Sequence, residues 1–410
     1  MADWMMRKVS MRALSIGTLL AMIIVPTAVL GQGNADSLLT RDNGAFAVDL
    51  YRQLCQDDGN LVFSPYSVTS GLAMAYAGAR GETAAEMAAA LHFGLPPAEL
   101  HAAMGRLERQ LAAINLGHWC KFAVANALWG QEGFAYKEDF LAIMESAYGA
   151  PLREVDFERP EEAFRIINNW ADKKTRGKIQ DLIPAGALNL YTRLVLANAI
   201  YFKGAWRAHF SKDKTRDEPF HLLDGIQVIA PLMRQCHAFP YVDLDSLQVT
   251  ELPYGDGDLA MLLALPRDLQ GLPSLEQSLS GDLLDAWIAS LQETDVQIFL
   301  PRFSARQSFH LAGTLKSMGM HRAFFFETAD FSGMSNTPLF VSAVLHRASV
   351  LTDELGTEAA AGTAVPIEWG IPPQPRTPPV FRADHPFLFM IRHRPSGCIL
   401  FMGRVLDPTR

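Results

Sequence analysis

The residues most able to do chemistry in this chain are its four cysteines and eleven histidines, which in other proteins act as nucleophiles, general bases and metal ligands. The cysteines lie far apart with no CxxC pair, and the histidines fall at no spacing typical of a metal site. The motifs GxSxG, HExxH and GxxxxGK are absent from the sequence. We therefore expect no catalytic centre, no metal and no cofactor, and the chain is predicted not to be an enzyme.

Two weaker signals have ordinary structural interpretations. Cys55, Cys120, Cys236 and Cys398 are expected to be mostly buried thiols, although an oxidising compartment would permit one disulfide. The pattern Gly255-x-Gly257-x-x-Ala260 loosely matches a dinucleotide-binding loop, but it lies between two short strand-like runs. Phosphate binding would require a helix directly after the glycines, so we predict a hairpin turn there.

The most informative segment is GTEAAAGT, Gly356 to Thr363, in which nearly every side chain is small. It follows an alternating apolar run and precedes the Pro-rich stretch Pro366 to Pro379. Small side chains would allow this segment to slide between neighbouring strands and be buried without a clash. A flexible surface loop is one simpler alternative, and a short helix is another because alanine favours helix.

The whole chain has a formal net charge of −8 at pH 7. A negative protein repels nucleic acid and anionic lipid, so neither is an expected partner. Heparin is not expected either, because the stretch 98–121 has only Arg106, Arg109 and Lys121 as permanent cations.

Residues 1–31 have the pattern of a secretory signal peptide. Three basic residues precede an apolar run from Ala13 to Leu30, and small residues before Gln32 suit cleavage there. An uncleaved membrane anchor is the alternative, but Pro26 and Gly31 favour cleavage. We expect a secreted, extracellular protein, or a periplasmic one in a bacterium, with no membrane attachment after cleavage.

The rest of the chain, residues 32–410, is predicted to be a single domain because no linker or repeat interrupts it. Apolar periodicity and start signals predict helices at Asn43 to Leu54, Ser67 to Ala79 and Ala163 to Thr175. Short apolar runs predict strands at Phe122 to Trp129, Leu194 to Phe202, Leu247 to Pro253, Ala260 to Leu265 and Val296 to Pro301. Helices concentrate early and strands late, which is typical of an α+β fold built on a large, mostly antiparallel sheet.

The chain resembles the serpin family over nearly all of its length after residue 31. Six blocks look like serpin signature blocks and follow the family's order: Asn60 to Met87, Ile167 to Ile183, Leu196 to Trp206, Leu300 to Met320, Asp330 to Met334 and His385 to Val405. The resemblance implies a single-domain serpin fold with large sheets and about eight or nine helices. It also implies an exposed reactive-centre loop from about Glu354 to Phe381, and inhibition of serine proteases as the function.

The resemblance also implies roles for particular residues. The family's hinge matches Glu354, Gly356, Thr357, Glu358, Ala359, Ala360, Ala361, Gly362 and Thr363. Its shutter, a polar cluster under the centre of the sheet, matches Ser64, Ser67, Asn198 and His346, and its breach, the point where insertion begins, matches Trp206 and Arg302. Arg302 is the implied partner of Glu354. Each of these residues could instead only stabilise the native sheet.

In serpins a protease attacks the loop as a substrate and forms a covalent acyl complex, and the cut loop then inserts into the main sheet. Here the inserted strand would run from Thr357 to about Ile367, with Pro366 removing one ladder hydrogen bond. We place the reactive bond at Gly370–Ile371, which suits elastase-like or subtilisin-like proteases. Alternative reactive residues are Trp369, for a chymotrypsin-like protease, Pro373, and Arg376, for a trypsin-like one.

Three alternative functions stay open at this point. A non-inhibitory serpin acting as a carrier, chaperone or storage protein would keep the fold without insertion, although bulky or charged hinge residues would then be expected. The loop could also inhibit cysteine proteases across class. A secreted hydrolase would need a nucleophile motif, which the sequence lacks. We expect a monomer.

Overall fold

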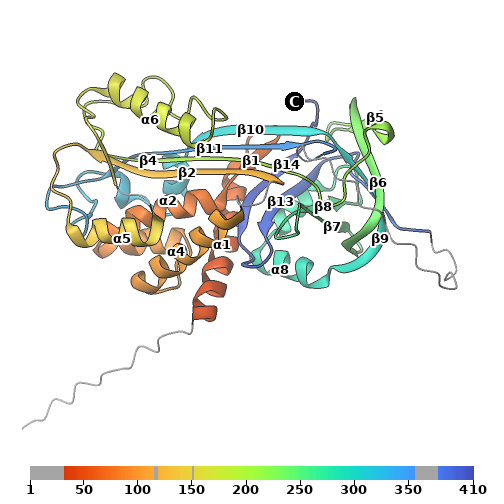
Figure 1. The fold of residues 1–410 in the computed structure, drawn as a ribbon, viewed down its shortest axis with the longest axis horizontal. Coiled ribbons are helices and arrows are strands. Elements are labelled where there is room, and N and C mark those ends of the chain that lie inside the picture. Colours follow the sequence, from red (N-terminus) through yellow and green to blue (C-terminus); the bar gives the residue numbers. More distant parts are fainter. Residues whose placement is uncertain (1–31, 115–118, 150–151, 356–376) are drawn as a thin grey trace, which may run out of the picture. The chain divides into compact units, whose positions relative to one another are not determined.

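The computed structural model describes residues 32–114, 119–149, 152–355 and 377–410, and Gln32–Arg410 forms one compact unit. Two sheets organise it (Figure 1). The five-stranded sheet has the order β10(Phe303–His310), β11(Val341–Thr352), β4(Leu194–Gly204), β2(Cys120–Gln131), β3(Arg153–Val155). The nine-stranded sheet has the order β1(Leu61–Phe63), β14(Ile399–Val405), β13(Phe387–His393), β8(Leu259–Pro266), β7(Leu247–Pro253), β6(Gln227–Asp243), β9(Gln292–Pro301), β12(Val380–Arg382), with β5(Arg216–His221) paired to β6.

Helices cover both faces of the five-stranded sheet. In Figure 1, α6(Pro160–Lys174) lies on one side of it, while α1(Gln32–Leu54), α2(Pro65–Gly78), α4(Pro97–Ile114) and α5(Glu138–Tyr148) lie on the other. The remaining helices among the described residues are α3(Gly81–Ala90), α7(Leu272–Ser278), α8(Gly281–Ser290), α9(Ala312–Ser317) and two short 3₁₀ turns, η1(Lys212–Lys214) and η2(Arg322–Phe324).

Burial on both faces explains the sequence of β4, LVLANAIYFKG, which is apolar almost throughout. Side chains alternate across a strand, so Val195 and Ala197 pack in the cluster beneath α6, whereas Leu194 and Leu196 join the larger core on the α2 side.

The α+β class and the large, mostly antiparallel sheets expected from the sequence are confirmed, as are nine α-helices within the described ranges. The predicted strands lie within β2, β4, β7, β8 and β9. The predicted helices also form, but the first begins at Gln32 rather than Asn43. Its polar first turns lack apolar periodicity, and tertiary contacts hold them: Leu39 is buried, and Asp36 pairs with Arg106.

The predicted hairpin at Gly255 is present between β7 and β8, which pair antiparallel. Gly255 and Gly257 have positive φ of 44° and 102°, and a Cβ on Gly255 would lie 2.0 Å from Trp119. Glycine is therefore required by the turn.

The expectation of mostly buried thiols holds for only half of the cysteines. Cys120 and Cys398 are buried, Cys55 is partly buried and Cys236 is exposed on β6, and all four thiols are free. Cys236 lies in a part of β6, Cys236 to Ala238, in which three consecutive residues are exposed.

Candidate functional site

The site that the sequence predicts lies along the middle of the five-stranded sheet, where β4 and β11 are parallel neighbours. Their ladder runs from the pair Val341 and Leu194 to the pair Val350 and Phe202, with one irregularity after Val341. We call this ladder the central seam. On its two sides, β10 pairs antiparallel with β11, and β2 pairs antiparallel with β4. The seam is thus one parallel ladder between two antiparallel ones.

A group of polar side chains lies under the seam, and we call it the central polar cluster: Ser64, Ser67, Asn198 and His346, which are buried, and Asn126, which is partly buried. His346 and Asn198 are partners across the seam. The backbone N–H of Ser64 donates to Nε2 of His346 at 2.9 Å, and Asn198 Nδ2 donates to the carbonyl of Ser67 at 3.1 Å. Both strands of the seam are therefore bonded to the first turn of α2.

Local sequence places this turn. Ser64 caps α2 by accepting a hydrogen bond from Ser67 N at 3.0 Å, and Pro65 occupies the first helical position. The Ser67 hydroxyl then donates to Asn126 Oδ1 at 2.6 Å, and Asn198 Nδ2 lies 3.2 Å from the same oxygen. Asn126 on β2 extends the cluster to a third strand.

Burial controls the charge state of His346. Desolvation lowers the pKa of this imidazole to about 3, while a backbone contact with Asn198 acts weakly in the opposite direction. The ring is therefore neutral at physiological pH, which lets Nε2 accept the hydrogen bond from Ser64.

In the three residues that follow β11 and Thr352, every backbone carbonyl accepts a hydrogen bond. We call Asp353, Glu354 and Leu355 the exit segment. The Asp353 carbonyl accepts from Trp206 Nε1 at 2.8 Å, the Glu354 carbonyl from Phe210 N at 3.0 Å, and the Leu355 carbonyl from Trp206 N at 3.3 Å. These contacts anchor the chain immediately before residue 356.

The side chains of the exit segment are held as well. Arg302 Nε donates to both oxygens of Glu354 at 2.8 Å, and Thr215 donates to Oε1 at 2.6 Å. Burial alone would raise the pKa of Glu354, but the hydrogen bonds from Arg302 and Thr215 outweigh it, so the pKa is lowered. Asp353 forms an ion pair with Lys203 at 3.4 Å.

Trp206 is fixed by aromatic packing. Its ring is 2% exposed, stacks on Tyr254 at a centroid distance of 4.4 Å and meets the edge of Phe210 at 6.1 Å. An indole held on both sides can present its N–H to Asp353 without losing further side-chain freedom.

The structure thus brings Ser64, Ser67, Asn198 and His346 together under the seam, and Trp206, Arg302 and Glu354 together at its end. The hinge from Gly356 to Thr363 lies outside the described residues, as do Trp369, Gly370, Ile371, Pro373 and Arg376 and the whole segment 1–31. Sequence reasoning missed Asn126, Thr215 and Lys203. Asn126 alone left a signal, since it is the one amide side chain in the interior of an apolar strand run, AVANALW.

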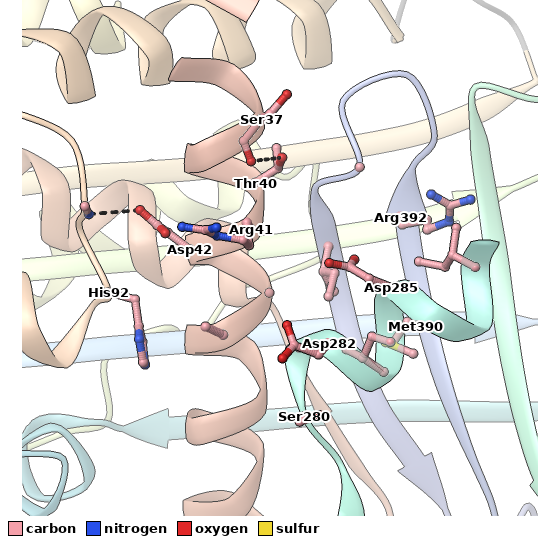
Figure 2. Close-up of a pocket in the computed structure, with 18 of the residues that line it drawn as sticks. Ser37, Thr40, Arg41, Asp42, His92, Ser280, Asp282, Asp285, Met390 and Arg392 are labelled. Atoms are coloured by element: carbon pink, nitrogen blue, oxygen red, sulfur yellow. Dashed lines mark hydrogen bonds between the residues drawn. The ribbon is translucent and has the colours of Figure 1, made fainter. Parts of the chain in front are cut away.

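A separate pocket of roughly 890 Å³ lies among α1, α8 and the strands β13 and β14 (Figure 2). Arg41 and Asp42 come from α1, and Asp282 and Asp285 come from α8. Asp42 accepts from Gly94 N at 2.9 Å, and Arg392 donates to Glu251 at 2.6 Å. The pocket shares no residue with the seam, the central polar cluster or the exit segment.

In the described ranges, no group of three or more histidine, cysteine, aspartate or glutamate side chains is arranged to hold a metal ion. The same ranges contain no helix with the length and apolarity needed to cross a membrane.

Comparison with known proteins identifies the class of molecule in which this arrangement occurs. The family model described as Serpin (serine protease inhibitor) matches residues 41–408. An uncharacterised serpin-like protein of Thermococcus kodakarensis is 40% identical over 93% of this chain and 88% of its own length. Leukocyte elastase inhibitor of Bos taurus is also 40% identical, over 90% of this chain and 99% of its own. The structure of Serpin48 from the insect Tenebrio molitor superposes with a TM-score of 0.79 at 30% identity, covering 91% of this chain and 98% of that one.

Proposed function

Because this chain belongs to the serpin family, we propose that it is a secreted inhibitor of serine proteases that is consumed by the enzyme it inactivates. The observation that carries the proposal is the central seam: two parallel neighbours, with the chain leaving one of them through a clamped exit segment.

The chemical step belongs to the protease. Its serine hydroxyl adds to the carbonyl carbon of Gly370, the Gly370–Ile371 amide bond breaks, and the Ile371 amine leaves with a proton from the enzyme's general acid. Gly370 stays attached to the protease as an ester, which water would normally hydrolyse. Inhibition therefore requires that something faster than hydrolysis follows.

Insertion of the cut loop supplies that step. A strand that turns back after Leu355 would run antiparallel to β11 and, since β4 is parallel to β11, antiparallel to β4 as well. One parallel ladder would be replaced by two antiparallel ladders, which adds hydrogen bonds and uses the more stable pairing geometry. Alternation would bury Thr357, Ala359, Ala361 and Thr363 on one face.

The contacts around the seam explain why the loop would not insert into the sheet before it is cut. Opening the seam separates His346 from Asn198. The hydrogen bonds that join each strand to the start of α2 oppose this separation. Insertion also requires release of the exit segment from Trp206, Phe210 and Arg302. These bonds form a barrier, so the uncut protein is kinetically trapped.

A small reactive residue sets the target class. Glycine at position 370 fits the narrow primary pocket of elastase-like and subtilisin-like proteases better than a deep pocket, and a relative named leukocyte elastase inhibitor supports the elastase-like choice. Trp369 would instead direct the loop to a chymotrypsin-like enzyme.

Secretion is part of the proposal. Cleavage before Gln32 would leave α1 whole, because that helix begins at Gln32 and its buried residues Ala35 and Leu39 lie beyond the cut. The product would be an extracellular protein, or a periplasmic one in a bacterium.

The test is to mix the protein lacking residues 1–31 with leukocyte elastase, subtilisin, chymotrypsin and trypsin. We expect a complex with elastase or subtilisin that survives SDS, and mass analysis of the released C-terminal peptide should show Ile371 at its start. Cleavage of the loop without any complex would support a non-inhibitory serpin and overturn the proposal. The cysteine protease papain is tested in parallel. A covalent adduct with papain but with none of the four serine proteases would make the protein an inhibitor of cysteine proteases instead.

A further inference from the structure

A groove of roughly 900 Å³ lies where α3, α4 and α5 meet the end of α2, and we call it the α4 groove. Its walls are small apolar side chains, among them Ala77, Ala98, Ala102 and Ala147. Ala98 and Ala102 are exposed, although the exposed face of a helix usually carries charged or polar residues. Sites for small molecules have this size and an apolar lining with a few polar groups. The α4 groove shares no residue with the pocket among α1, α8, β13 and β14.

The charges that line the α4 groove have one sign. Arg80, Arg106 and Arg109 line it, and its described lining residues include no aspartate or glutamate. Arg106 is paired with Asp36, and Arg80 donates to two backbone carbonyls at the end of α2. Arg109 is exposed and has no hydrogen-bond or ion-pair partner in the described part of the chain. On a chain of net charge −8, such a groove is a local site of attraction for an anion.

The α4 groove also contains a buried imidazole with an unused nitrogen. His101 is 5% exposed and lines the groove, and its Nε2 has no hydrogen-bond partner among the described residues. Its Nδ1 lies 2.7 Å from the hydroxyl of Tyr148. Burial lowers the pKa of His101 to about 4, so the ring is neutral at physiological pH and carries one proton.

The buried hydroxyl of Tyr148 decides which nitrogen carries that proton, because Nδ1 of His101 is the one acceptor recorded for it among the described residues. If Nδ1 carried the proton, the phenolic hydrogen and the Nε2 lone pair would both lack a partner. If the hydroxyl donates to Nδ1, only the Nε2–H lacks one, which is the less costly arrangement. His101 is therefore a hydrogen-bond donor, and its missing partner is an oxygen acceptor.

One stripe of α4 joins the two polar groups. His101, Gly105 and Arg109 follow one another at intervals of four residues, so they lie on one face of the helix. Eight residues of helix rise by about 12 Å, which separates the buried donor from the exposed guanidinium. Between them, Gly105 lets α4 approach α5 closely, since a Cβ there would lie 2.9 Å from the Ala147 carbonyl oxygen.

We propose that the α4 groove binds an amphipathic carboxylate, a small molecule with an apolar body, a carboxylate at one end and a hydroxyl or carbonyl oxygen near the other. The carboxylate pairs with Arg109, the apolar body lies against the alanine walls, and the far oxygen accepts a hydrogen bond from His101 Nε2. This inference goes beyond the proposed function, because inhibition of a protease by a loop requires no small ligand.

The test is calorimetric titration of the protein with 10-hydroxydecanoate, decanoate and decane-1,10-diol, each below the concentration at which it aggregates. 10-Hydroxydecanoate should bind at one site per chain. Decanoate should bind about fivefold more weakly because it lacks the far oxygen, as expected for the loss of one neutral hydrogen bond. The diol should bind at least about tenfold more weakly because it lacks the charged group that pairs with Arg109.

Three variants assign the contacts. Arg109→Gln should weaken both carboxylates at least about tenfold. His101→Phe should make the affinities of the two carboxylates equal, and Ala102→Leu should abolish binding because it fills the groove from an exposed position. The matched controls are Arg165→Gln on α6 and Ala85→Leu on α3, which change exposed residues outside the groove and should bind both carboxylates as the wild type does.

His101→Phe also leaves the Tyr148 hydroxyl without its acceptor, so urea unfolding checks that this variant is folded. Ala102→Leu alters no buried group and tests the groove without that cost. The inference is overturned if 10-hydroxydecanoate shows no saturable binding, or if Arg109→Gln and Ala102→Leu leave its binding unchanged. Equal affinity of the wild type for the two carboxylates also overturns it, since His101 would then have no partner in the ligand. Complex formation with a protease tests the proposed function separately from all of these outcomes.

Discussion

At the scale of single residues, one carboxylate holds the start of the loop. Glu354 is 2% exposed, its charge is balanced by Arg302, and its carboxylate also accepts a hydrogen bond from the hydroxyl of Thr215. Arg302 is itself 43% exposed, so the pair is only partly shielded. Its value lies less in the attraction than in the cost of leaving a buried carboxylate without its donors.

Arg302→Ala should therefore destabilise the protein by about 2 kcal/mol, the range for lost hydrogen bonds to a charged group. Lysine at 302 should recover part of this loss because it keeps the charge but not the fork of donors. Urea unfolding measures the change. Arg306→Ala, which removes an exposed arginine from the following strand β10, should stay within about 0.5 kcal/mol of the wild type; equal losses in the two alanine variants would contradict the role of the pair.

His346 should make stability depend on pH. Its folded pKa is lowered to about 3, whereas an unfolded histidine has a pKa near 6.5. Between these values the unfolded chain binds a proton that the folded ring does not, so the free energy of unfolding falls as the pH falls. The contribution of His346 is complete above about pH 6.5, and about 2 kcal/mol of it should be lost between pH 7 and pH 5.

The measurement is urea unfolding of wild type and His346→Gln at both pH values. Glutamine cannot titrate, so the variant's stability should fall by about 2 kcal/mol less than that of the wild type over this interval. His101, whose pKa burial lowers to about 4, remains in both proteins and contributes equally. His237→Gln replaces an exposed imidazole and should leave the wild-type profile unchanged; identical profiles for wild type and His346→Gln would show that His346 does not carry the effect.

At the scale of elements, local signals predicted much of the fold. The short apolar runs of β4 and β8 and the Ser64-Pro65 start of α2 can each be recognised within a few residues of sequence. The parallel pairing of β4 with β11 cannot be recognised locally, because it joins distant parts of the chain. The clamp on the exit segment has no sequence signature either, since its acceptors are backbone carbonyls.

The inserted strand gives the prediction at this scale. Thr357→Arg should convert the protein from an inhibitor into a substrate, because an arginine on the inward face would have to be buried without a partner. Covalent complex with elastase should fall at least about tenfold while loop cleavage continues, as judged by SDS gels. Glu358→Arg is the control, since alternation places that side chain on the opposite face. Unaltered inhibition by Thr357→Arg would contradict insertion from this point.

At the scale of the whole molecule, the proposed function treats the five-stranded sheet of the uncut fold as able to accept a further strand. The seam joins two strands that could each pair with an antiparallel neighbour, and the chain for that neighbour follows directly after β11. The contacts that hold the present arrangement are distributed: they include hydrogen bonds to α2, the aromatic packing around Trp206 and the Arg302–Glu354 pair. Under the proposed insertion mechanism, the stability of the uncut protein would report a barrier rather than the lowest free energy.

Cutting the loop without trapping an enzyme should reveal the difference. A strand of about eleven residues adds about as many ladder hydrogen bonds, each worth roughly 1 kcal/mol net, which gives about 10 kcal/mol. A domain of this size has an unfolding entropy near 0.8 kcal/mol per kelvin, so the melting temperature should rise by more than about 10 °C. Calorimetry before and after cleavage of the loop by a protease that escapes inhibition measures this. Cut Thr357→Arg protein should show no such rise, because its strand cannot enter, and a wild-type melting temperature that stays constant on cleavage would mean that the seam does not open.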